Sequence, residues 1–264
     1  MPPDTDELVR LAEDLARRAG YLLRDALRGG RVDIDTKTSA TDMVTEMDRS
    51  AEELIVEGLQ VARPDDGVLA EESGEREGTS GVRWVIDPLD GTTNYLYAHP
   101  RYGVSIAAEL DGDVVAAAVA DPSFDEVFTA VKGGGARLNG EPIAHSGHAD
   151  LSTALVATGF SYLPERRAHQ AEVLKRLLPE VRDIRRHGAA SLDLCWVACG
   201  RVDAYYEMTL QPWDVAAGVL VAAEAGAVVS GVGGGPPSAE SVFASAPDLA
   251  GPLLQLLQDA GAAG

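Results

Sequence analysis

Hydrophobic residues near the start of the chain recur every three or four positions, the spacing of one face of an α-helix. The first such run extends from Asp4 to Arg28 and is followed by Gly29 and Gly30. A second run, from about Glu46 to Gln60, stops before Pro64. Acidic residues at a helix start and glycine after its end are typical boundary signals. The pattern therefore predicts two amphipathic helices, with the polar stretch DIDTKTSATDMV between them.

Between residues 82 and 143 the chain instead has short apolar runs separated by turn residues. RWVID comes first, YGVSIAAEL and VVAAAVAD then flank Asp111-Gly112-Asp113, and DEVFTAVK is followed by KGGGARLNG with its Asn139-Gly140 turn. Apolar runs joined by such turns are typical of β-hairpins. We therefore predict an antiparallel meander here, preceded by a loop at GEREGTSG.

From about Leu151 onward, strand-like and helix-like segments alternate. The strand-like segments are STALVATGF, VRDIRR, VDAYYEM and AVVSG, and the helix-like ones are PERRAHQAEVLKRLL, GAASLDLCWVACG, WDVAAGVLVAAEAG and a last stretch near Pro247 to Ala260. Such alternation is typical of α/β folds. The chain is therefore predicted to be α/β, with an α+β N-terminal part at residues 1–150 and an α/β part at residues 151–264.

Composition narrows the function classes. Forty-two acidic residues against 22 basic ones give a net charge of −20, which repels nucleic acids and anionic membranes because both carry dense negative charge. The N-terminus has no basic head followed by an apolar run, and no segment approaches the roughly 18 apolar residues that span a bilayer. We expect a soluble, cytoplasmic protein with no nucleic-acid or membrane partner. Cys195 and Cys199, one helical turn apart, fit packing side chains better than a disulfide or a zinc site.

The clearest chemical signal is the stretch WVIDPLDGTTNY. Asp87 ends an aliphatic strand, where a carboxylate has to be paired, hydrogen-bonded or metal-bound. Pro88 and Gly91 shape a turn that lets Asp90 and the Leu89 carbonyl approach it. Hard cations such as magnesium prefer this all-oxygen set and complete it with water and phosphate. Because the amides and hydroxyls of GTTN follow directly, as at the start of a short helix that binds an anion, the motif predicts phosphate-ester chemistry.

Two further acidic positions fit the same chemistry. Glu71 and Glu72 follow GVLA, and Asp214 opens the helix-like segment WDVAAGVLVAAEAG. Each also has an ordinary explanation, since the glutamates suit a solvated loop and Asp214 suits a helix cap. The residues alone leave these alternatives open.

Several motifs together resemble the inositol monophosphatase family of magnesium-dependent, lithium-sensitive phosphatases. They are AEES, DPLDGTTNY and WDVAAGVLVAAEAG, and RRHGAASLDLCWVACGRVDAYYEM resembles the family's substrate-pocket segment. The resemblance runs in family order from the first helix to the last. It implies a layered α/β/α/β/α sandwich of the inositol monophosphatase and fructose-1,6-bisphosphatase type, and usually a homodimer.

The resemblance also implies a magnesium site. A first ion would be held by Glu71, Asp87 and the Leu89 carbonyl, and a second by Asp87, Asp90 and Asp214. A third, weaker ion would lie near Glu71. Two ions that share one carboxylate lie close enough to stabilise both the attacking and the leaving oxygen of an in-line displacement.

Catalytic roles carry over by the same resemblance. Water oriented by Glu71 and the Thr92 hydroxyl would attack phosphorus, while the backbone of Gly91 and Thr92 binds the phosphate. Water near Asp214 or Asp90 would protonate the leaving alcohol. No cysteine or serine is assigned as a nucleophile, because no covalent phosphoenzyme is needed.

Further positions match the family's substrate contacts. Glu207 ends the strand-like segment VDAYYE, where it suits paired hydroxyls but could equally face solvent. Lys37 and Asp48 match positions near the metals, with Lys37 balancing the acids and Asp48 supporting a ligand, although Asp48 also suits the first turn of its own helix. The positions matched to polyol contacts are Asp90, Gly188, Ala189, Ala190, Glu207 and Asp214.

The predicted function is hydrolysis of inositol monophosphate or a similar polyol phosphate. Alternatives in the same superfamily are histidinol-phosphate, fructose-1,6-bisphosphate and 3′-phosphoadenosine 5′-phosphate phosphatases, and Thr93 argues against the first, which often has lysine there. A non-catalytic binding protein with this fold is a further alternative. Three residues depart from common family choices, namely Ala70, Ser161 and Ala189. The last two belong to the polyol side of the pocket and bear on which ester is the substrate.

Overall fold

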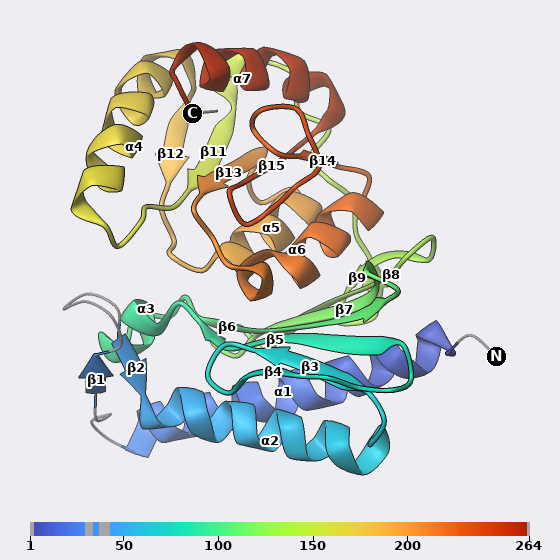
Figure 1. Ribbon diagram of the computed structural model, residues 1–264. Helices are drawn as coiled ribbons and strands as arrows, with labels where there is room; N and C mark the ends of the chain where they lie inside the picture. The colour runs from blue at the N-terminus through green and yellow to red at the C-terminus, as the bar shows by residue number, and fades with distance from the viewer. Residues whose placement is uncertain (1–2, 30–33, 37–42, 263–264) are drawn as a thin grey trace.

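The computed structural model describes residues 3–29, 34–36 and 43–262, which form five stacked layers (Figure 1). Helices α1 and α2 form the first layer and an eight-stranded sheet the second; α5 and α6 follow, then a five-stranded sheet, and α4 and α7 lie outermost. This is the sandwich that the resemblance implied. The helices are α1 (Thr5–Gly29), α2 (Glu46–Ala62), α3 (Thr92–Leu96), α4 (Pro164–Leu177), α5 (Ala190–Ala198), α6 (Pro212–Glu224) and α7 (Pro247–Asp259), with 3₁₀ turns at Leu151–Thr153 and Leu178–Glu180.

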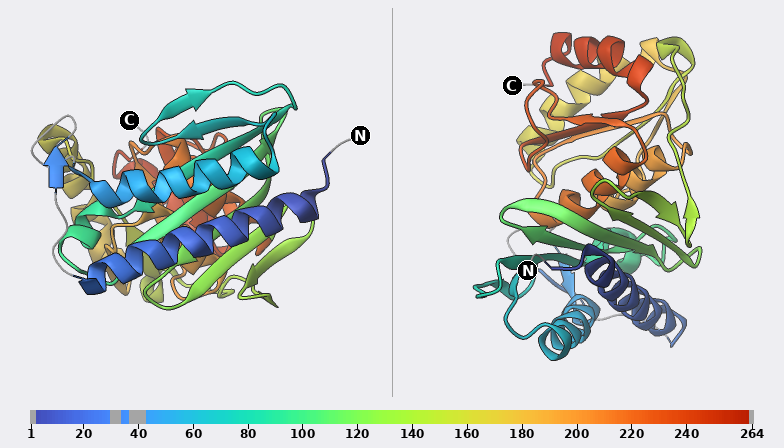
Figure 2. Two further views of the ribbon diagram at one scale, coloured as in Figure 1. Left: turned by 90° about the horizontal axis from the view of Figure 1, so that it is seen from below. Right: turned by 90° about the vertical axis from the view of Figure 1, so that its right-hand side faces the viewer.

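The two N-terminal helices lie side by side across one face of the large sheet (Figure 2, left). Both fall within two residues of their predicted ends. Leu8, Leu15 and Leu23 of α1 are fully buried, as the helical spacing predicts. The Tyr95 hydroxyl donates a 2.9 Å hydrogen bond to the Leu23 carbonyl and ties α1 to α3. The first layer therefore supports the segment that carries the DGTTN motif.

The large sheet runs in the order β10-β9-β8-β7-β6-β5-β3-β4, and its strands from β5 to β10 form the predicted antiparallel meander. Strand β3 pairs with β5 in parallel. The prediction of a continuous loop at GEREGTSG is wrong, because Gly74–Arg76 forms the edge strand β4. One face of an edge strand can be exposed to solvent, so its side chains can be charged. Such a strand lacks the apolar residues by which strands are recognised in a sequence. The strands are β3 (Gly67–Ala70), β4, β5 (Val82–Asp90), β6 (Gly103–Leu110), β7 (Asp113–Asp121), β8 (Glu126–Val131), β9 (Gly135–Leu138) and β10 (Glu141–Pro142).

The second sheet runs in the order β12-β11-β13-β15-β14 and mixes parallel with antiparallel pairs. Strand β15, from SVFAS, was not among the predicted strands, although it lies between β13 and β14. Its inner residues are fully buried, so it has no alternating pattern. The strands are β11 (Leu155–Thr158), β12 (Asp183–Arg185), β13 (Ala204–Met208), β14 (Val228–Ser230) and β15 (Ser241–Ser245), and a separate two-stranded sheet pairs β1 (Ile34–Thr36) with β2 (Met43–Thr45).

The two sheets lie on either side of residue 150 in the sequence, but α5 and α6 contact strands of both. The division at residue 150 therefore stays a prediction. Within the described ranges no helix is long and apolar enough to cross a membrane. Cys195 and Cys199 are both unbridged, and Cys195 is packed in the core between the sheets.

Candidate active site

The DPLDGTTN motif begins inside strand β5, which continues to Asp90 and does not stop at Asp87 as the sequence predicted. Asp87 pairs with Ser105 and Asp90 with Gly103, so the register shifts between them. An extra residue in one strand bends it locally and re-aims its side chains, and Pro88 removes a backbone donor there. The Leu89 amide donates a 3.0 Å hydrogen bond to Asp87 Oδ1.

Gly91 begins helix α3, and only glycine fits its position. Its φ is +89°, and a Cβ atom there would lie 2.9 Å from the Arg101 carbonyl oxygen and 3.1 Å from that of Gly188. The predicted short helix at GTTN is thus confirmed. Thr92 Oγ1 donates to the Leu89 carbonyl at 3.1 Å and lies 3.4 Å from Asp48 Oδ1. The backbone turn and the threonine hydroxyl are therefore both held in place.

Glu71 lies beside this motif because β3 runs parallel to β5. Ala70 pairs with Ile86, and the Glu71 amide donates to the Ile86 carbonyl at 3.3 Å. The next two amides, of Glu72 and Ser73, donate to the buried carboxylate of Glu52 at 2.8 and 2.7 Å. The AEES segment is therefore a fixed turn, held from α2, and not a solvated loop.

The carboxylates of Asp90 and Asp214 both accept hydrogen bonds at the start of a helix, α5 for Asp90 and α6 for Asp214. Asp214 accepts a 2.6 Å hydrogen bond from the Gln211 amide, so the capping explanation of this residue is correct. Asp90 accepts from the Ser191 amide and hydroxyl at 2.7 and 2.6 Å and from the Ala190 amide at 3.3 Å. Capping leaves each carboxylate facing the same cavity, so the capping and active-site explanations do not exclude each other.

One cavity of about 550 Å³ collects most of the predicted site residues. Ala189 does not line it, because its side chain is buried against Gly91. Asp48 does not line the cavity but accepts a hydrogen bond from Thr92, which does, and Lys37 lies outside the described residues. The predicted residues that line the cavity are Glu71, Asp87, Leu89, Asp90, Gly91, Thr92, Gly188, Ala190, Glu207 and Asp214.

The carboxylates in this cavity raise one another's pKa values. Burial and the charges of Glu71, Asp90 and Asp214 hold the pKa of Asp87 well above its ordinary value. Burial raises the pKa of Asp90 to about 7 although Ser191 stabilises its ionised form, and burial and Asp90 raise the pKa of Asp214 as well. No described basic side chain forms an ion pair with Asp87, Asp90 or Asp214. Ionisation of the cluster therefore calls for a cation from solution.

The donors of this cluster suit a hard divalent cation. Glu71, Asp87, Asp90, Asp214 and the Leu89 carbonyl offer oxygen only, the ligand type that magnesium prefers. Across the described ranges no three acidic, histidine or cysteine side chains are already gathered as a metal-binding group, since two of these carboxylates turn oxygens to helix starts. The residues therefore fit such an ion by their chemistry.

Glu207 faces the carboxylate cluster from the second sheet. It extends from β13 into the cavity, and the Tyr205 hydroxyl donates to its Oε2 at 2.7 Å. Burial raises the pKa of Glu207 to about 7, against the stabilising bond from Tyr205. Gly159 packs against this carboxylate so closely that a Cβ atom would overlap it. Glu207 therefore belongs to the cavity and not to a solvent-facing strand end.

Comparison with known proteins agrees with this geometry. A family model described as the inositol monophosphatase family matches residues 4–262. The chain belongs to the inositol monophosphatase family. It is 43% identical over 278 residues to the inositol-1-monophosphatase of Mycobacterium leprae, covering 97% of this chain and 94% of that protein. The resemblance seen in the sequence is thus confirmed, and the protein is a phosphomonoesterase of this family.

Other relatives carry a different name. The Nus factor SuhB of Vibrio cholerae is 38% identical over 258 residues, covering 96% of this chain and 97% of that protein. The crystal structure of extragenic suppressor protein suhB from Bartonella henselae has a TM-score of 0.91 and 38% identity, covering 96% of this chain and 98% of that one. The predicted fold is therefore shared with solved members of the family.

The cavity wall opposite the carboxylates comes from residues that the sequence did not single out. Most of them follow β11, open α4 or precede α5. Burial raises the pKa of Tyr162 and the nearby Thr93 side chain counteracts this rise, so the wall adjoins α3. Of these residues, Trp213 stands next to Asp214 and Arg186 lies within the segment that resembles the family's substrate pocket. The wall residues are Phe160, Tyr162, Leu163, Arg166, Arg186 and Trp213.

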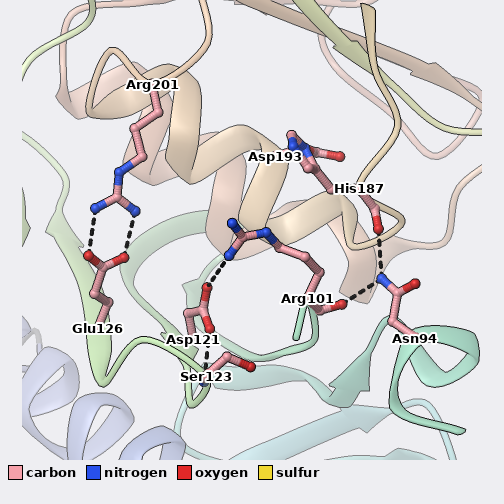
Figure 3. A network of polar contacts seen from close by, with 8 residues as sticks. All are labelled: Asn94, Arg101, Asp121, Ser123, Glu126, His187, Asp193 and Arg201. Carbon is pink, nitrogen blue, oxygen red and sulfur yellow. Dashed lines mark hydrogen bonds and ion pairs between the residues drawn. The ribbon is translucent and has the colours of Figure 1, made fainter. Parts of the chain in front are cut away.

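A polar network supports the site from behind (Figure 3). Asn94, the last residue of DGTTN, donates from Nδ2 to the carbonyls of Arg101 and His187, both at 2.6 Å. It thereby fastens α3 to the segment that precedes α5. The Arg101 guanidinium lies 4.3 Å from the centre of the Trp196 ring and 3.8 Å from buried Asp121. The DGTTN segment is therefore fastened to the segment before α5 by hydrogen bonds within the protein.

Proposed function

We propose that this phosphomonoesterase hydrolyses inositol monophosphate or a similar polyol phosphate and uses magnesium. The observation that carries the proposal is the convergence of Glu71, Asp87, Asp90 and Asp214 from three separate segments on one cavity. Burial and mutual repulsion disfavour their ionised forms without a cation. Divalent cations between carboxylates and phosphate resolve this repulsion and let a very acidic protein bind an anionic ester.

Two magnesium ions are proposed, each held by residues of the motif turn and its neighbours. Glu71, Asp87 and the Leu89 carbonyl would hold the first, and Asp87, Asp90 and Asp214 the second; a third, weaker ion would lie near Glu71. When bound, these ions supply positive charge to the phosphate and make water more acidic.

The protein's own groups position the reactants. Thr92, whose hydroxyl is fixed on the Leu89 carbonyl, and Glu71 orient the attacking water, and the amides of Gly91 and Thr92 bind the phosphate. A bond forms between the water oxygen and phosphorus as the ester P–O bond breaks. Water held by Asp214 or Asp90 gives a proton to the leaving alkoxide, which becomes the alcohol, and the proton lost by the attacking water replaces it through solvent.

The alcohol part of the ester is proposed to contact Glu207, Gly188 and Ala190. Two acceptor oxygens of Glu207 suit neighbouring hydroxyls, and the Tyr205 bond fixes their direction. Ala189 is proposed to support this region by packing behind Gly91 and not by contacting the alcohol. Lys37 and Asp48 remain proposed supports of the metal site. A homodimer, cytoplasmic location, lithium sensitivity and separate units at 1–150 and 151–264 are further parts of the proposal.

A phosphate-release panel tests the proposal. Inositol 1-phosphate, fructose 1,6-bisphosphate, histidinol phosphate and 3′-phosphoadenosine 5′-phosphate are assayed with magnesium and with a chelator. We expect magnesium-dependent release from polyol esters, lost in Asp90→Asn. Absence of release from every ester, or an unchanged rate in Asp90→Asn, rejects it.

A non-catalytic binding role is the second candidate, and the name of the Vibrio cholerae relative, Nus factor SuhB, favours it. It predicts a protein that binds magnesium by calorimetry but releases no phosphate from the panel. Calorimetry and phosphate release on the same sample separate the two roles.

A further inference from the structure

A second cavity, of about 620 Å³, adjoins the active-site cavity of about 550 Å³, and helix α4 of the outermost layer supplies part of its lining (Figure 1). Glu207 lines only the active-site cavity and Met208 only the second one, as expected for consecutive side chains on opposite faces of strand β13. The two cavities therefore lie on opposite faces of the second sheet and meet where β13 ends. The residues that line both are Arg166, Thr209, Leu210 and Gln211.

Thr209, the first residue after β13, has an unusual backbone conformation. Its φ of +66° lies in the left-handed region, where a β-branched residue is strained and glycine is not. None of the other non-glycine residues with a positive φ in the described ranges is β-branched, and most are Asp or Asn, which tolerate this conformation. These residues are Ala98, Asp111, Asp125 and Asn139. Thr209 therefore carries more backbone strain than any of them.

Contacts with the segment before β15 hold Thr209 in this conformation. The Thr209 amide donates to the Glu240 carbonyl at 2.9 Å, and the Leu210 amide donates to the Ala239 carbonyl at 2.7 Å. These two bonds continue the antiparallel pairing of β13 with β15 beyond Met208. The backbone of the turn is thus fixed by its surroundings, and any residue at position 209 has to accept the same φ.

The side chain of Thr209 contributes little to the fold. It is exposed, and its hydroxyl donates to the carbonyl of the adjacent Met208. No hydrogen bond of this side chain reaches another segment within the described ranges. Since glycine would fit this backbone without strain, a strained side chain here indicates a function for the side chain itself. What distinguishes it is its place at the boundary of two cavities.

We propose that the Thr209 side chain is a size filter, which closes the passage between the two cavities and confines the alcohol part of the ester to the active-site cavity. A cavity of about 550 Å³ is within the range that holds one small ligand. Without the side chain, a longer alcohol could extend around the end of β13 into the second cavity. The inference rests on the proposed phosphatase activity and concerns the size of its substrate. It adds no chemical step, because the same ester bond is cleaved.

Monophosphate esters that differ by one neutral sugar ring test the inference. The pairs are inositol 1-phosphate with its 6-O-glucosyl derivative and glucose 6-phosphate with trehalose 6-phosphate, each assayed with magnesium. Wild-type kcat/KM should be at least about tenfold lower for the two-ring member, because its second ring does not fit the closed cavity. Both members of a pair carry the same charge, so the comparison measures size alone.

Substitution of Thr209 by glycine removes the filter and the strain together. In at least one pair, Thr209→Gly should raise kcat/KM for the two-ring ester about ten times more than for the one-ring ester. Its melting temperature should be at or above that of the wild type, because release of strain offsets the added freedom of the unfolded chain. Thr209→Val keeps the shape of the side chain without its hydroxyl and should keep the wild-type ratio.

Asp111→Gly controls for a glycine introduced at a positive φ. Asp111 has a φ of +53° in the hairpin between β6 and β7, outside both cavities. The variant should therefore leave kcat/KM for both members of each pair within about twofold of the wild type.

Each outcome decides one question. If the wild type hydrolyses both members of every pair equally well, or if Thr209→Gly leaves every ratio unchanged, Thr209 is not a size filter. A lower melting temperature of Thr209→Gly with an equal loss of kcat/KM for both members would show that Thr209 only supports the turn, and the inference is then wrong. In these cases magnesium-dependent hydrolysis of the one-ring esters still supports the proposed function. If no one-ring ester is hydrolysed, the proposed function itself has failed.

Discussion

The carboxylates around helix α5 fall into two groups that differ in their partners. Along its flank, Glu126 pairs with Arg201, Asp121 lies 3.8 Å from Arg101, and Asp193 pairs with His187 (Figure 3). At its N-terminus, burial and the charge of Asp90 raise the pKa values of Asp87 and Asp214, and none of these three carboxylates forms an ion pair with a basic side chain that the structure describes. Burying an ionised carboxylate without a partner costs several kcal/mol. The flanking carboxylates are therefore balanced by basic side chains of the protein itself, whereas the cavity carboxylates are proposed to be balanced by a cation from solution.

The largest expected effect contrasts Asp87→Asn with Glu126→Gln. Asp87→Asn should lower kcat/KM by about 10³-fold or more, because its carboxylate is proposed to hold both metals. In chelator at pH 8 the same variant should melt above the wild type, since the amide removes a buried like charge. Glu126→Gln should keep its activity and lose a little stability. Activity of Asp87→Asn within tenfold of the wild type would contradict this assignment.

A second prediction compares two glycines with the same backbone strain. Gly91→Ala and Gly112→Ala both place alanine at a φ near +88°, from values of +89° and +87°. A Cβ atom at Gly112 meets open space, whereas at Gly91 it meets two backbone carbonyls. Gly112→Ala should lose about 1–2 kcal/mol of stability from backbone strain alone. Gly91→Ala should lose more, because the backbone must shift, and should also lose about 10²-fold in kcat/KM through a displaced turn. Equal kinetics in the two variants would show that the turn tolerates movement.

A third prediction concerns the Asn94 contact between α3 and the segment before α5. Asn94→Ala removes two hydrogen bonds and should cost about 1–3 kcal/mol of stability and about tenfold in kcat/KM. Asn139→Gly is the control, because Asn139 also makes two backbone bonds, at 2.8 and 3.1 Å, but in a distant hairpin. Asn139→Gly should lose stability but keep the kcat/KM of the wild type. Denaturant unfolding and steady-state kinetics on both variants check this, and a purely structural Asn94 would leave kcat/KM unchanged.

The smallest expected effect is a pH dependence in the flanking group. Burial raises the pKa of Asp121 from 3.8 to about 6, against the stabilising Ser123 amide and Arg101 charge. A carboxyl with a raised folded-state pKa contributes stability fully below pH 3.8 and loses it as the pH rises through about 6.

The melting temperature of Asp121→Asn minus that of the wild type should therefore increase by a few °C between pH 5 and pH 8. Magnesium-saturated samples keep the cavity carboxylates ionised throughout. A constant difference between the two proteins across this range would show that Asp121 does not titrate there.

Much of the motif chemistry could be predicted from the sequence because its residues are neighbours in the chain. The turn at Pro88 and Gly91, the short helix after it and the hairpin at Asp111 depend on local backbone preferences. The family resemblance then supplied Glu71, Glu207 and Asp214, which lie in separate segments, and the structure places all three on the cavity.

The remaining features depend on contacts between distant segments. Asp90 caps α5 across 101 positions of sequence, and Asn94 reaches His187 across 93. Edge strand β4 and buried strand β15 lack the alternation that marks half-buried strands. Arg166 looks like an ordinary surface residue in the sequence, and only the fold shows that it lines the cavity.

The central claim is that Asp87, Asp90 and Asp214, together with Glu71, bind magnesium, and titration calorimetry of the wild-type protein with magnesium chloride at pH 8 tests it most directly. The account predicts binding of two ions per chain, and loss of that binding in Asp87→Asn but not in Glu126→Gln. Absence of magnesium binding to the wild type, or equal binding to Asp87→Asn, would contradict it.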